Sequence, residues 1–244
     1  MTTTKPASPQ LLQVEVSYRK DYTPHIFVLK LRPLFHFSFK AGQYCTLGVN
    51  GIERAYSIVS SPDEPELELI IELVPEGELT PLLYQLRVGD RLECRPKAKG
   101  IFTFDERFPN QVMCSTVTGV APFISILRYL KVHPTKSGFN FYLVYGGSYA
   151  DELVYHEEFT QMAQEMPNLK YVPTISRPTE ARNNGWSHET GRVNLVVDRI
   201  YPSWNLDTKS TLFYACGHPG MIEDVKEKFK PRGYQVKEER FWKE

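Results

Sequence analysis

Arg54, Tyr56 and Ser57 bring a cation, a flat ring and a hydroxyl together in the stretch Arg54-Ala55-Tyr56-Ser57. Side chains alternate along a strand, so Arg54 and Tyr56 should project to one side and Ser57 to the other. An arginine fork bonds two phosphate oxygens at once, and an aromatic ring stacks on another flat ring. A flavin nucleotide offers a partner for each group. An ordinary amphipathic strand, with a surface arginine and a half-buried tyrosine, is the competing interpretation.

A second anion site is suggested by residues 76–84. Thr80 is expected to cap a helix whose first residue is Pro81. A helix N-terminus attracts anions through its unpaired N–H groups and the positive end of its dipole. The Thr80 hydroxyl is able to accept from the backbone and still donate to a phosphate. A capped helix without a ligand is the alternative.

The residues around these two sites have the pattern of short strands. Apolar and polar residues alternate over 12–18, and five further runs follow at 26–31, 43–49, 52–60, 67–74 and 91–96. The dipeptide Asn50-Gly51 separates two of the runs and is a strong hairpin signal. Short strands at this spacing predict a closed antiparallel barrel, to which we assign residues 11–106.

The second part of the chain, residues 111–244, has a different pattern. Apolar strands alternate there with amphipathic helices, which predicts a doubly wound parallel sheet. Ligands bind such sheets at the carboxyl ends of the strands. The turns that follow predicted strands lie at 116–122, 146–147, 176–177 and 216–217, so we expect a ligand site there.

Composition excludes several classes of protein. Of the 244 residues, 41% are hydrophobic and 24% are charged, with a formal net charge of zero, which argues against disorder, membrane spans and nucleic-acid binding. Neither the six histidines nor the cysteines have metal-ligand spacing, so no metal site is expected. The cysteines, which predict reduced thiols in a cytoplasmic protein, are Cys45, Cys94, Cys114 and Cys216. Residues 1–10 are rich in Thr, Ser and Pro, and we expect them to be flexible and to be neither a secretion signal nor an anchor.

Taken in order, the motifs resemble those of the bacterial ferredoxin/flavodoxin–NADP reductase family. They cover nearly the whole chain: residues 54–57, Gly77-Glu78-Leu79-Thr80, Thr118-Gly119-Val120-Ala121-Pro122, Cys216-Gly217-His218-Pro219 and an aromatic-rich C-terminus. The resemblance implies an FAD-binding antiparallel Greek-key β-barrel followed by an NADP-binding α/β domain. It also implies that Arg54, Gly77 and Thr80 hold the FAD pyrophosphate, that Tyr56 stacks on the flavin and that Ser57 bonds its N5 edge.

The same resemblance assigns the nicotinamide nucleotide to the second domain. Thr118 and Gly119 lie in the turn that approaches its phosphates, but Val117 stands where the family has a glycine. A β-branched residue does not adopt a positive φ cheaply, so we expect a negative φ there or an altered turn. Arg177 is the main candidate for the 2′-phosphate of NADP, with Arg192 and Arg182 as further candidates. A solvated surface arginine is the alternative for each.

Three further roles follow from the resemblance. Cys216 would lie at the nicotinamide C4 carbon, with a buried structural thiol as the alternative. Glu239 would place a carboxylate near the nicotinamide, with a solvated strand residue as its alternative. Phe241 or Trp242 would stack on the flavin or on the adenine.

The implied reaction is hydride transfer from NADPH to FAD, followed by release of single electrons to ferredoxin or flavodoxin. We expect a monomer whose acidic carrier docks on a basic cluster made of Arg87, Arg91, Arg95, Lys97 and Lys99, unless that cluster is only a solvated face. Two alternatives remain open at this stage. The chain could be the reductase component of an oxygenase, or a flavin-binding interaction subunit that does not turn over NADPH, as Val117 suggests.

Overall fold

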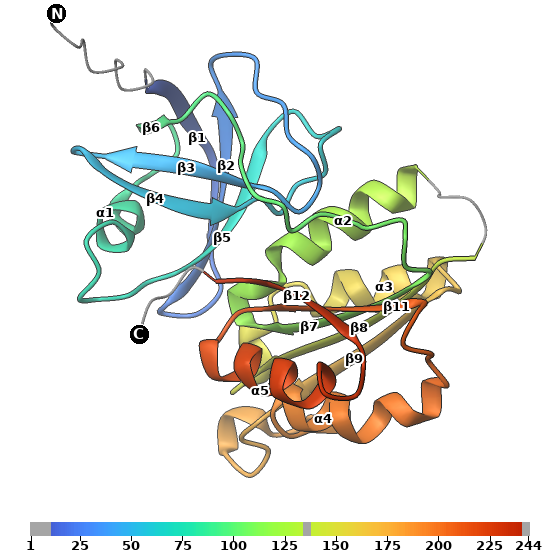
Figure 1. Ribbon diagram of the computed structural model, residues 1–244. Helices are drawn as coiled ribbons and strands as arrows, with labels where there is room; N and C mark the ends of the chain where they lie inside the picture. The colour runs from blue at the N-terminus through green and yellow to red at the C-terminus, as the bar shows by residue number, and fades with distance from the viewer. Residues whose placement is uncertain (1–10, 134–137, 241–244) are drawn as a thin grey trace, which may run out of the picture.

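The first of two sheets is an antiparallel barrel of six strands. A computed structural model of the protein describes residues 11–133 and 138–240 and shows the two sheets in separate halves (Figure 1). The strand order is β4-β3-β6-β1-β2-β5. The strands are β1 (Leu12–Asp21), β2 (Ile26–Pro33), β3 (Tyr44–Val49), β4 (Ile52–Ser57), β5 (Leu67–Glu72) and β6 (Arg91–Cys94). The barrel closes just beyond β4, where the Val59 N–H donates to the Glu68 carbonyl at 2.8 Å. The predicted antiparallel Greek-key barrel is confirmed.

The hairpin between β3 and β4 forms at the predicted dipeptide. Asn50 and Gly51 have φ values of 52° and 78°. Two successive positive φ values fit the type I′ turn, whose twist matches that of the flanking strands. This turn fixes the register of β4 and so fixes the faces on which Arg54 and Ser57 emerge.

The helix α1 (Thr80–Gln85) interrupts the barrel, and its start differs from the expectation. Thr80 is the first helical residue, not the cap, and the capping position is occupied by Leu79. The Thr80 hydroxyl instead accepts from the Val74 N–H at 3.0 Å and donates to the Val74 carbonyl at 3.1 Å. The side chain therefore ties the helix to the chain leaving β5, because those two backbone groups need partners.

The second sheet is parallel throughout, with the order β10-β9-β8-β7-β11-β12. Its strands are β7 (Asn110–Thr116), β8 (Asn140–Gly147), β9 (Leu169–Ile175), β10 (Glu189–Thr190), β11 (Thr211–Cys216) and β12 (Gln235–Glu239). The strand order reverses between β7 and β11, the position at which such sheets bind ligands. The predicted doubly wound domain is confirmed.

Helices cover both faces of the parallel sheet. The buried side chains of α2 (Ala121–Val132) and α3 (His156–Glu165) pack on one face, and those of α4 (Val193–Ile200) and α5 (Pro219–Phe229) pack on the other. The face under α2 is the one nearest the barrel (Figure 1). Among the described residues, no helix is long and apolar enough to cross a membrane.

The two domains share one apolar core. The cluster around Phe123 and Ile126 of α2 includes Val28, Val59 and Ile70 of the barrel. Phe102 packs against Phe123 with ring centroids 5.5 Å apart. Burial of these side chains holds the domains together, and the cavities described next lie between them or beside their junction.

Candidate functional site

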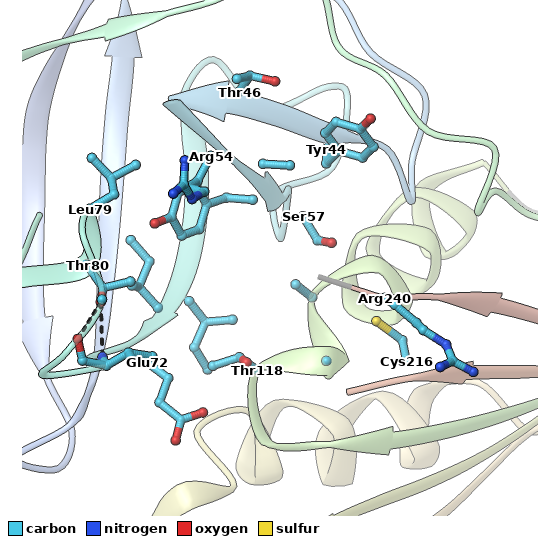
Figure 2. Close-up of a pocket in the computed structure, with 18 of the residues that line it drawn as sticks. Tyr44, Thr46, Arg54, Ser57, Glu72, Leu79, Thr80, Thr118, Cys216 and Arg240 are labelled. Atoms are coloured by element: carbon cyan, nitrogen blue, oxygen red, sulfur yellow. Dashed lines mark hydrogen bonds between the residues drawn. The ribbon is translucent and has the colours of Figure 1, made fainter. Parts of the chain in front are cut away.

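A cavity of about 580 Å³ lies between the barrel and the parallel sheet. The barrel contributes β4, the end of β5 and the start of α1, and the other domain contributes the turn after β7, the start of α2 and the end of β11 (Figure 2). Small-molecule sites typically have volumes of about 300–1,000 Å³. The size and the two-domain lining therefore fit a ligand that contacts both halves.

The stretch Arg54-Ala55-Tyr56-Ser57 borders this cavity along its whole length. Arg54 is half exposed, and its guanidinium pairs with the Glu78 carboxylate near the start of α1. Tyr56 is largely buried; burial, followed by the neighbouring Cys45, raises the pKa of its phenol, so the ring stays neutral. The cation and the ring predicted from the sequence thus occupy one wall.

Gly77 and Thr80 line the same cavity and flank Glu78, the partner of Arg54. A Cβ atom on Gly77 would lie 3.0 Å from the Val74 carbonyl and 3.1 Å from Thr80 Oγ1, so a larger residue would crowd this turn. Thr80 borders the cavity, but its hydroxyl proton is already donated to Val74 (Figure 2). The expected free donor is therefore absent, because the backbone uses it.

Ser57, Cys216 and Glu239 converge although they are far apart in the chain. Cys216 and Glu239 are paired neighbours at the ends of β11 and β12. Ser57 Oγ donates to Glu239 Oε2 at 3.4 Å, across a sequence separation of 182. The three residues predicted to act on the reacting groups therefore lie together where the two domains meet.

Burial raises the pKa values of two residues in this group, Glu239 and Cys216. It raises the pKa of Glu239 to about 7, against the opposing hydrogen bond from Ser57 and the charge of Lys237. Burial also raises the pKa of the Cys216 thiol, and Glu239 adds to the effect. Cys216 is thus a neutral thiol, and Glu239 is able to hold or release a proton near neutral pH.

The turn after β7 corrects one expectation. Val117 has φ +44°, so of the two alternatives expected there, a negative φ or an altered turn, the negative φ is wrong. The start of α2 is fixed by its core packing, and Gly119 passes so close to β11 that a Cβ atom there would lie 2.3 Å from the Cys216 carbonyl oxygen. The short connection therefore needs a left-handed residue. Packing of the Val117 side chain against the shared core compensates part of the cost.

A second cavity, of about 960 Å³, opens at the carboxyl ends of the parallel strands. Its lining includes residues from all four turns predicted from the sequence. It shares three residues with the first cavity: Glu72, Thr118 and Gly217. The two cavities therefore meet at the predicted nucleotide turn, within reach of the Ser57 group.

The arginines of the second cavity differ in their partners. Arg177 contacts the Tyr149 hydroxyl at 3.1 Å and Glu180 at 3.3 Å. Arg192 also borders the cavity and makes no ion pair within the described part of the chain. Arg182 is not part of the lining; it pairs with Asp151 at 2.7 Å and lies over the Tyr149 ring. Of the three candidates, two therefore face the cavity.

Glu72 and Arg240 are charged cavity residues that were not predicted. Glu72 is a mostly buried carboxylate whose pKa is raised by burial and by Glu152, and it points toward the loop that carries Thr118 (Figure 2). Arg240 borders the first cavity and pairs with Glu223 and Glu238. The only sequence signal for Glu72 was an acid inside an apolar run, which also holds Glu68. Arg240 gave none.

The remaining predictions concern the tail and the basic cluster. Phe241 and Trp242 lie outside the described residues. In the basic cluster, Arg95 pairs with Glu53 at 2.6 Å and Arg91 pairs with Glu15 at 3.4 Å. Lys99 borders the first cavity. The four cysteines are free and buried, and in the described segments no group of His, Cys, Asp and Glu could hold a metal ion.

The residues of the first cavity fit an FAD molecule. A guanidinium next to a tight glycine turn suits a pyrophosphate, and a buried neutral phenol suits a stacked ring. Ser57 and Glu239 supply polar groups at the edge that faces the other domain. The second cavity continues from there over the ends of the parallel strands, where a dinucleotide would lie.

Comparison with known proteins agrees with this geometry. Residues 14–102 match the oxidoreductase FAD-binding domain, and residues 113–227 match the oxidoreductase NAD-binding domain. A flavodoxin/ferredoxin–NADP reductase of Escherichia coli (strain K12) is 30% identical over 225 residues, which cover 86% of each chain. The reductase component of a propane 2-monooxygenase from Mycolicibacterium goodii is 29% identical, over 88% of this chain and 62% of that protein.

A solved structure extends the agreement to three dimensions. The crystal structure of a ferredoxin NADP+ reductase from Neisseria gonorrhoeae with bound FAD and NADP has a TM-score of 0.82 and 25% identity. The match covers 95% of this chain and 99% of that one. With the fold, the two cavities and these relatives in agreement, the chain belongs to the flavodoxin/ferredoxin–NADP reductase family.

Proposed function

We propose that this protein is an FAD-dependent reductase that passes electrons between NADPH and a one-electron carrier, ferredoxin or flavodoxin. The observation that carries the proposal is the convergence of Ser57, Cys216 and Glu239 from two domains at the meeting point of the two cavities. The chemistry that FAD supplies when bound is the exchange between a hydride donor and a one-electron carrier. The protein supplies position and electrostatics.

The barrel would hold the flavin. Arg54 would bind the pyrophosphate after exchanging its Glu78 partner, and the turn at Gly77 would allow the backbone to approach. Tyr56 would lie against the ring. Thr80 would act indirectly, by fixing the start of α1 through Val74.

The α/β domain would hold NADPH. Thr118 and Gly119 would approach its pyrophosphate, and Arg177 and Arg192 would bind the 2′-phosphate. Cys216, neutral and fully buried, would border the nicotinamide without a charge that disturbs it. Glu239 would hold a proton close to the Ser57 hydroxyl, and this hydroxyl would orient the flavin edge.

The carrier would dock beside the first cavity. Lys97 and Lys99 have no carboxylate partner among the described residues, and Lys99 reaches the cavity itself. Ile101 next to them is 84% exposed. A positive rim around an exposed apolar residue suits an acidic carrier that must come close to the flavin. We further propose that the protein works as a cytoplasmic monomer.

Anaerobic stopped-flow mixing with NADPH tests the reductase function. The purified protein, loaded with FAD, should lose its flavin absorption rapidly, and more slowly with NADH. Added ferredoxin or flavodoxin should then restore the absorption, with a rate that falls as salt rises. A yellow protein that keeps its colour with NADPH would refute the reductase claim and would favour the flavin-binding interaction subunit.

A second candidate is the reductase component of an oxygenase, as the name of the Mycolicibacterium goodii relative suggests. The site would be the same, and only the acceptor would differ. Reoxidation by a purified oxygenase component, without any response to ferredoxin or flavodoxin, would favour this candidate.

A further inference from the structure

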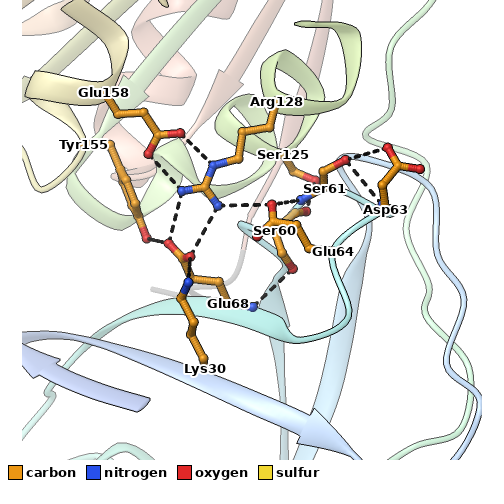
Figure 3. Close-up of polar contacts among 10 residues, drawn as sticks. All are labelled: Lys30, Ser60, Ser61, Asp63, Glu64, Glu68, Ser125, Arg128, Tyr155 and Glu158. Atoms are coloured by element: carbon orange, nitrogen blue, oxygen red, sulfur yellow. Dashed lines mark hydrogen bonds and ion pairs between the residues drawn. The ribbon is translucent and has the colours of Figure 1, made fainter. Parts of the chain in front are cut away.

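Polar contacts between the two domains centre on Arg128 of α2 (Figure 3). Its side chain is 17% exposed. Arg128 Nε and Nη2 donate to the two oxygens of Glu158 at 2.7 and 2.8 Å. Glu158 lies in the first turn of α3, so this two-pronged bond joins two helices of the same domain and fixes the plane of the guanidinium.

The same guanidinium crosses to the barrel. Its two Nη atoms donate to Glu68 of β5 at 3.3 and 3.4 Å, and Nη1 also reaches Glu64 at 3.5 Å. Glu68 is only 7% exposed, and it also accepts from the Tyr155 hydroxyl at 2.8 Å. Burial opposes ionisation of Glu68, but Arg128, Tyr155 and Lys30 outweigh it and lower its pKa. The carboxylate is therefore charged and fully occupied by partners.

A second polar contact lies three residues earlier on α2. Ser125 Oγ donates to the Ser60 carbonyl of the barrel at 2.7 Å, and both serines are buried. The Ser60 hydroxyl in turn accepts from the Glu68 N–H at 3.1 Å. Residues three apart share one helix face, so Ser125 and Arg128 fasten the same side of α2 to the same part of the barrel.

The elements that this cluster joins are the ones that carry the site. Glu68 and Glu72 lie near opposite ends of β5, and Ser60 follows the end of β4 at Ser57. At the other side, α2 begins directly after the turn that carries Gly119. Apolar burial attracts without direction, whereas paired hydrogen bonds fix an angle. The cluster is therefore placed to set how the two halves of the site face each other.

We propose that Arg128 is a positioning residue for hydride transfer: its cluster with Glu68, Glu158, Tyr155 and Ser125 sets the angle between the flavin half and the nicotinamide half. The proposal rests on the proposed reductase function. It does not require the cluster to bind either nucleotide, because none of its members lines the two cavities. Transfer between two bound groups depends steeply on their separation, and a shift of about 1 Å costs up to roughly 10²-fold in rate.

The test is anaerobic stopped-flow reduction of the FAD-loaded Arg128→Met variant by saturating NADPH. The rate constant of flavin reduction should fall about tenfold or more. The flavin absorption spectrum should stay unchanged, because FAD binds the barrel. The affinity for 2′,5′-ADP, which probes only the adenosine end of the α/β domain, should stay within about twofold of wild type. Arg128→Lys should recover part of the rate, since it keeps the charge but loses the fork.

Lys131→Met is the matched control. Lys131 lies one turn further along α2 and pairs with Glu165 of α3, so its removal breaks a contact between α2 and α3 without touching the barrel. Its reduction rate should match wild type. If Arg128→Met fails to fold, Glu68→Gln gives the same test, because the amide keeps the shape and the Tyr155 partner but loses the charge that faces Arg128.

The outcomes separate the two proposals. If NADPH does not reduce the flavin of the wild-type protein, the proposed function itself is refuted. Wild-type reduction with an unchanged rate in both Arg128→Met and Glu68→Gln would overturn the positioning role alone. Loss of 2′,5′-ADP binding in parallel with the rate would also overturn it, since it would show general damage to the α/β domain.

Discussion

At the scale of single residues, the fold decides which groups keep a proton. Glu239 is held in a mostly buried position beside Ser57 and Cys216, and its pKa rises from the ordinary 4.5 to about 7. Arg54, which lines the same cavity as Ser57 and Cys216, remains half exposed beside Glu78. The site therefore combines a carboxyl group that titrates near neutral pH with a permanent cation that is free to exchange partners.

Glu239 should make the stability of the protein depend on pH. Its folded-state pKa lies above its unfolded value, so its contribution is complete below about pH 4.5 and is lost as pH rises through about 7. The loss is on the order of 3 kcal/mol at about 1.4 kcal/mol per unit. Urea unfolding of wild type and Glu239→Gln at pH 5 and pH 8 measures it. The variant should lose less stability between the two pH values.

Glu238→Gln is the control for that experiment, because Glu238 lies on the same strand but pairs with Lys226 at 2.9 Å. It should keep the wild-type difference between pH 5 and pH 8. An equal pH dependence in wild type and Glu239→Gln would assign the titration to another group.

Coenzyme preference should depend on Arg177 and Arg192, which face the second cavity. Replacing either with alanine should lower the ratio of kcat/KM for NADPH to that for NADH by about tenfold, because the 2′-phosphate loses a charged donor. Glu180→Gln should raise the ratio, since Glu180 competes for Arg177. Steady-state kinetics with both coenzymes give these ratios.

Arg182→Ala serves as the comparison, because Arg182 pairs with Asp151 away from the cavity lining. Its ratio should match wild type. An unchanged ratio in Arg177→Ala would remove that residue from the site and leave the phosphate to Arg192.

At the scale of elements, the connections between regular segments carry the site. The short helix α1 is anchored to β5 by one side chain, since Thr80 Oγ1 satisfies both backbone groups of Val74. The turn after β7 is anchored by the close approach of Gly119 to Cys216. Both connections border the cavity, so small changes in them should reach the bound groups.

Thr80→Val should destabilise the protein by about 1–3 kcal/mol, because it leaves the Val74 N–H without a partner and leaves the Val74 carbonyl with the Gly77 N–H alone. It should also weaken FAD binding, since α1 loses its tie to β5. Chemical unfolding and titration of the FAD-free protein with FAD measure the two effects. Thr80→Ser keeps the hydroxyl and should stay close to wild type; a similar loss in both variants would show that the methyl group matters instead.

The strands were largely predictable because their apolar patterns repeat locally. The alternation at β1, the Asn50-Gly51 hairpin and the change to strands alternating with helices after residue 111 all appear where the sequence indicates. Details that are fixed by contacts between distant residues were not predictable. Threonine favours the N-cap position by local propensity, yet the Thr80 hydroxyl hydrogen-bonds to the Val74 backbone instead. Val117 disfavours a positive φ, yet the packing of α2 and Gly119 imposes one.

The candidate site, like the strands, was predictable where its residues belong to local sequence patterns. Arg54, Ser57 and Cys216 stand in recognisable local motifs, and the structure places them on one cavity. Glu72 and Arg240 are recognised as site residues only from the partners that the fold brings near them. No periodicity in the sequence encodes such partners.

At the scale of the whole molecule, the two domains are joined by a common core. Phe123 of α2 is fully buried against Phe102 and Tyr214, with ring centroids 5.5 and 6.3 Å away. Side chains from the barrel strands belong to the same cluster. The domains should therefore unfold together, although each has a further core of its own.

Phe123→Ala should lower the free energy of unfolding by about 3–5 kcal/mol, since it opens a cavity in the shared core. The visible circular dichroism of the bound flavin reports on the barrel, and the far-ultraviolet signal reports mainly on the helices of the other domain. Both transitions should shift together in urea. Leu195→Ala, at a side chain 54% exposed, should shift neither. Different urea midpoints for the two signals would indicate that the domains unfold independently.

The pairing of Glu239 on β12 with Ser57 on β4 has a consequence for how the protein is made. All barrel strands precede the first strand of the parallel sheet, so a growing chain on the ribosome is able to complete its flavin-holding half early. The carboxyl partner of Ser57 leaves the ribosome only after every other strand has been synthesised. Newly made chains therefore receive the barrel wall of the cofactor cavity first, and its wall from the α/β domain and the partner of Ser57 only later.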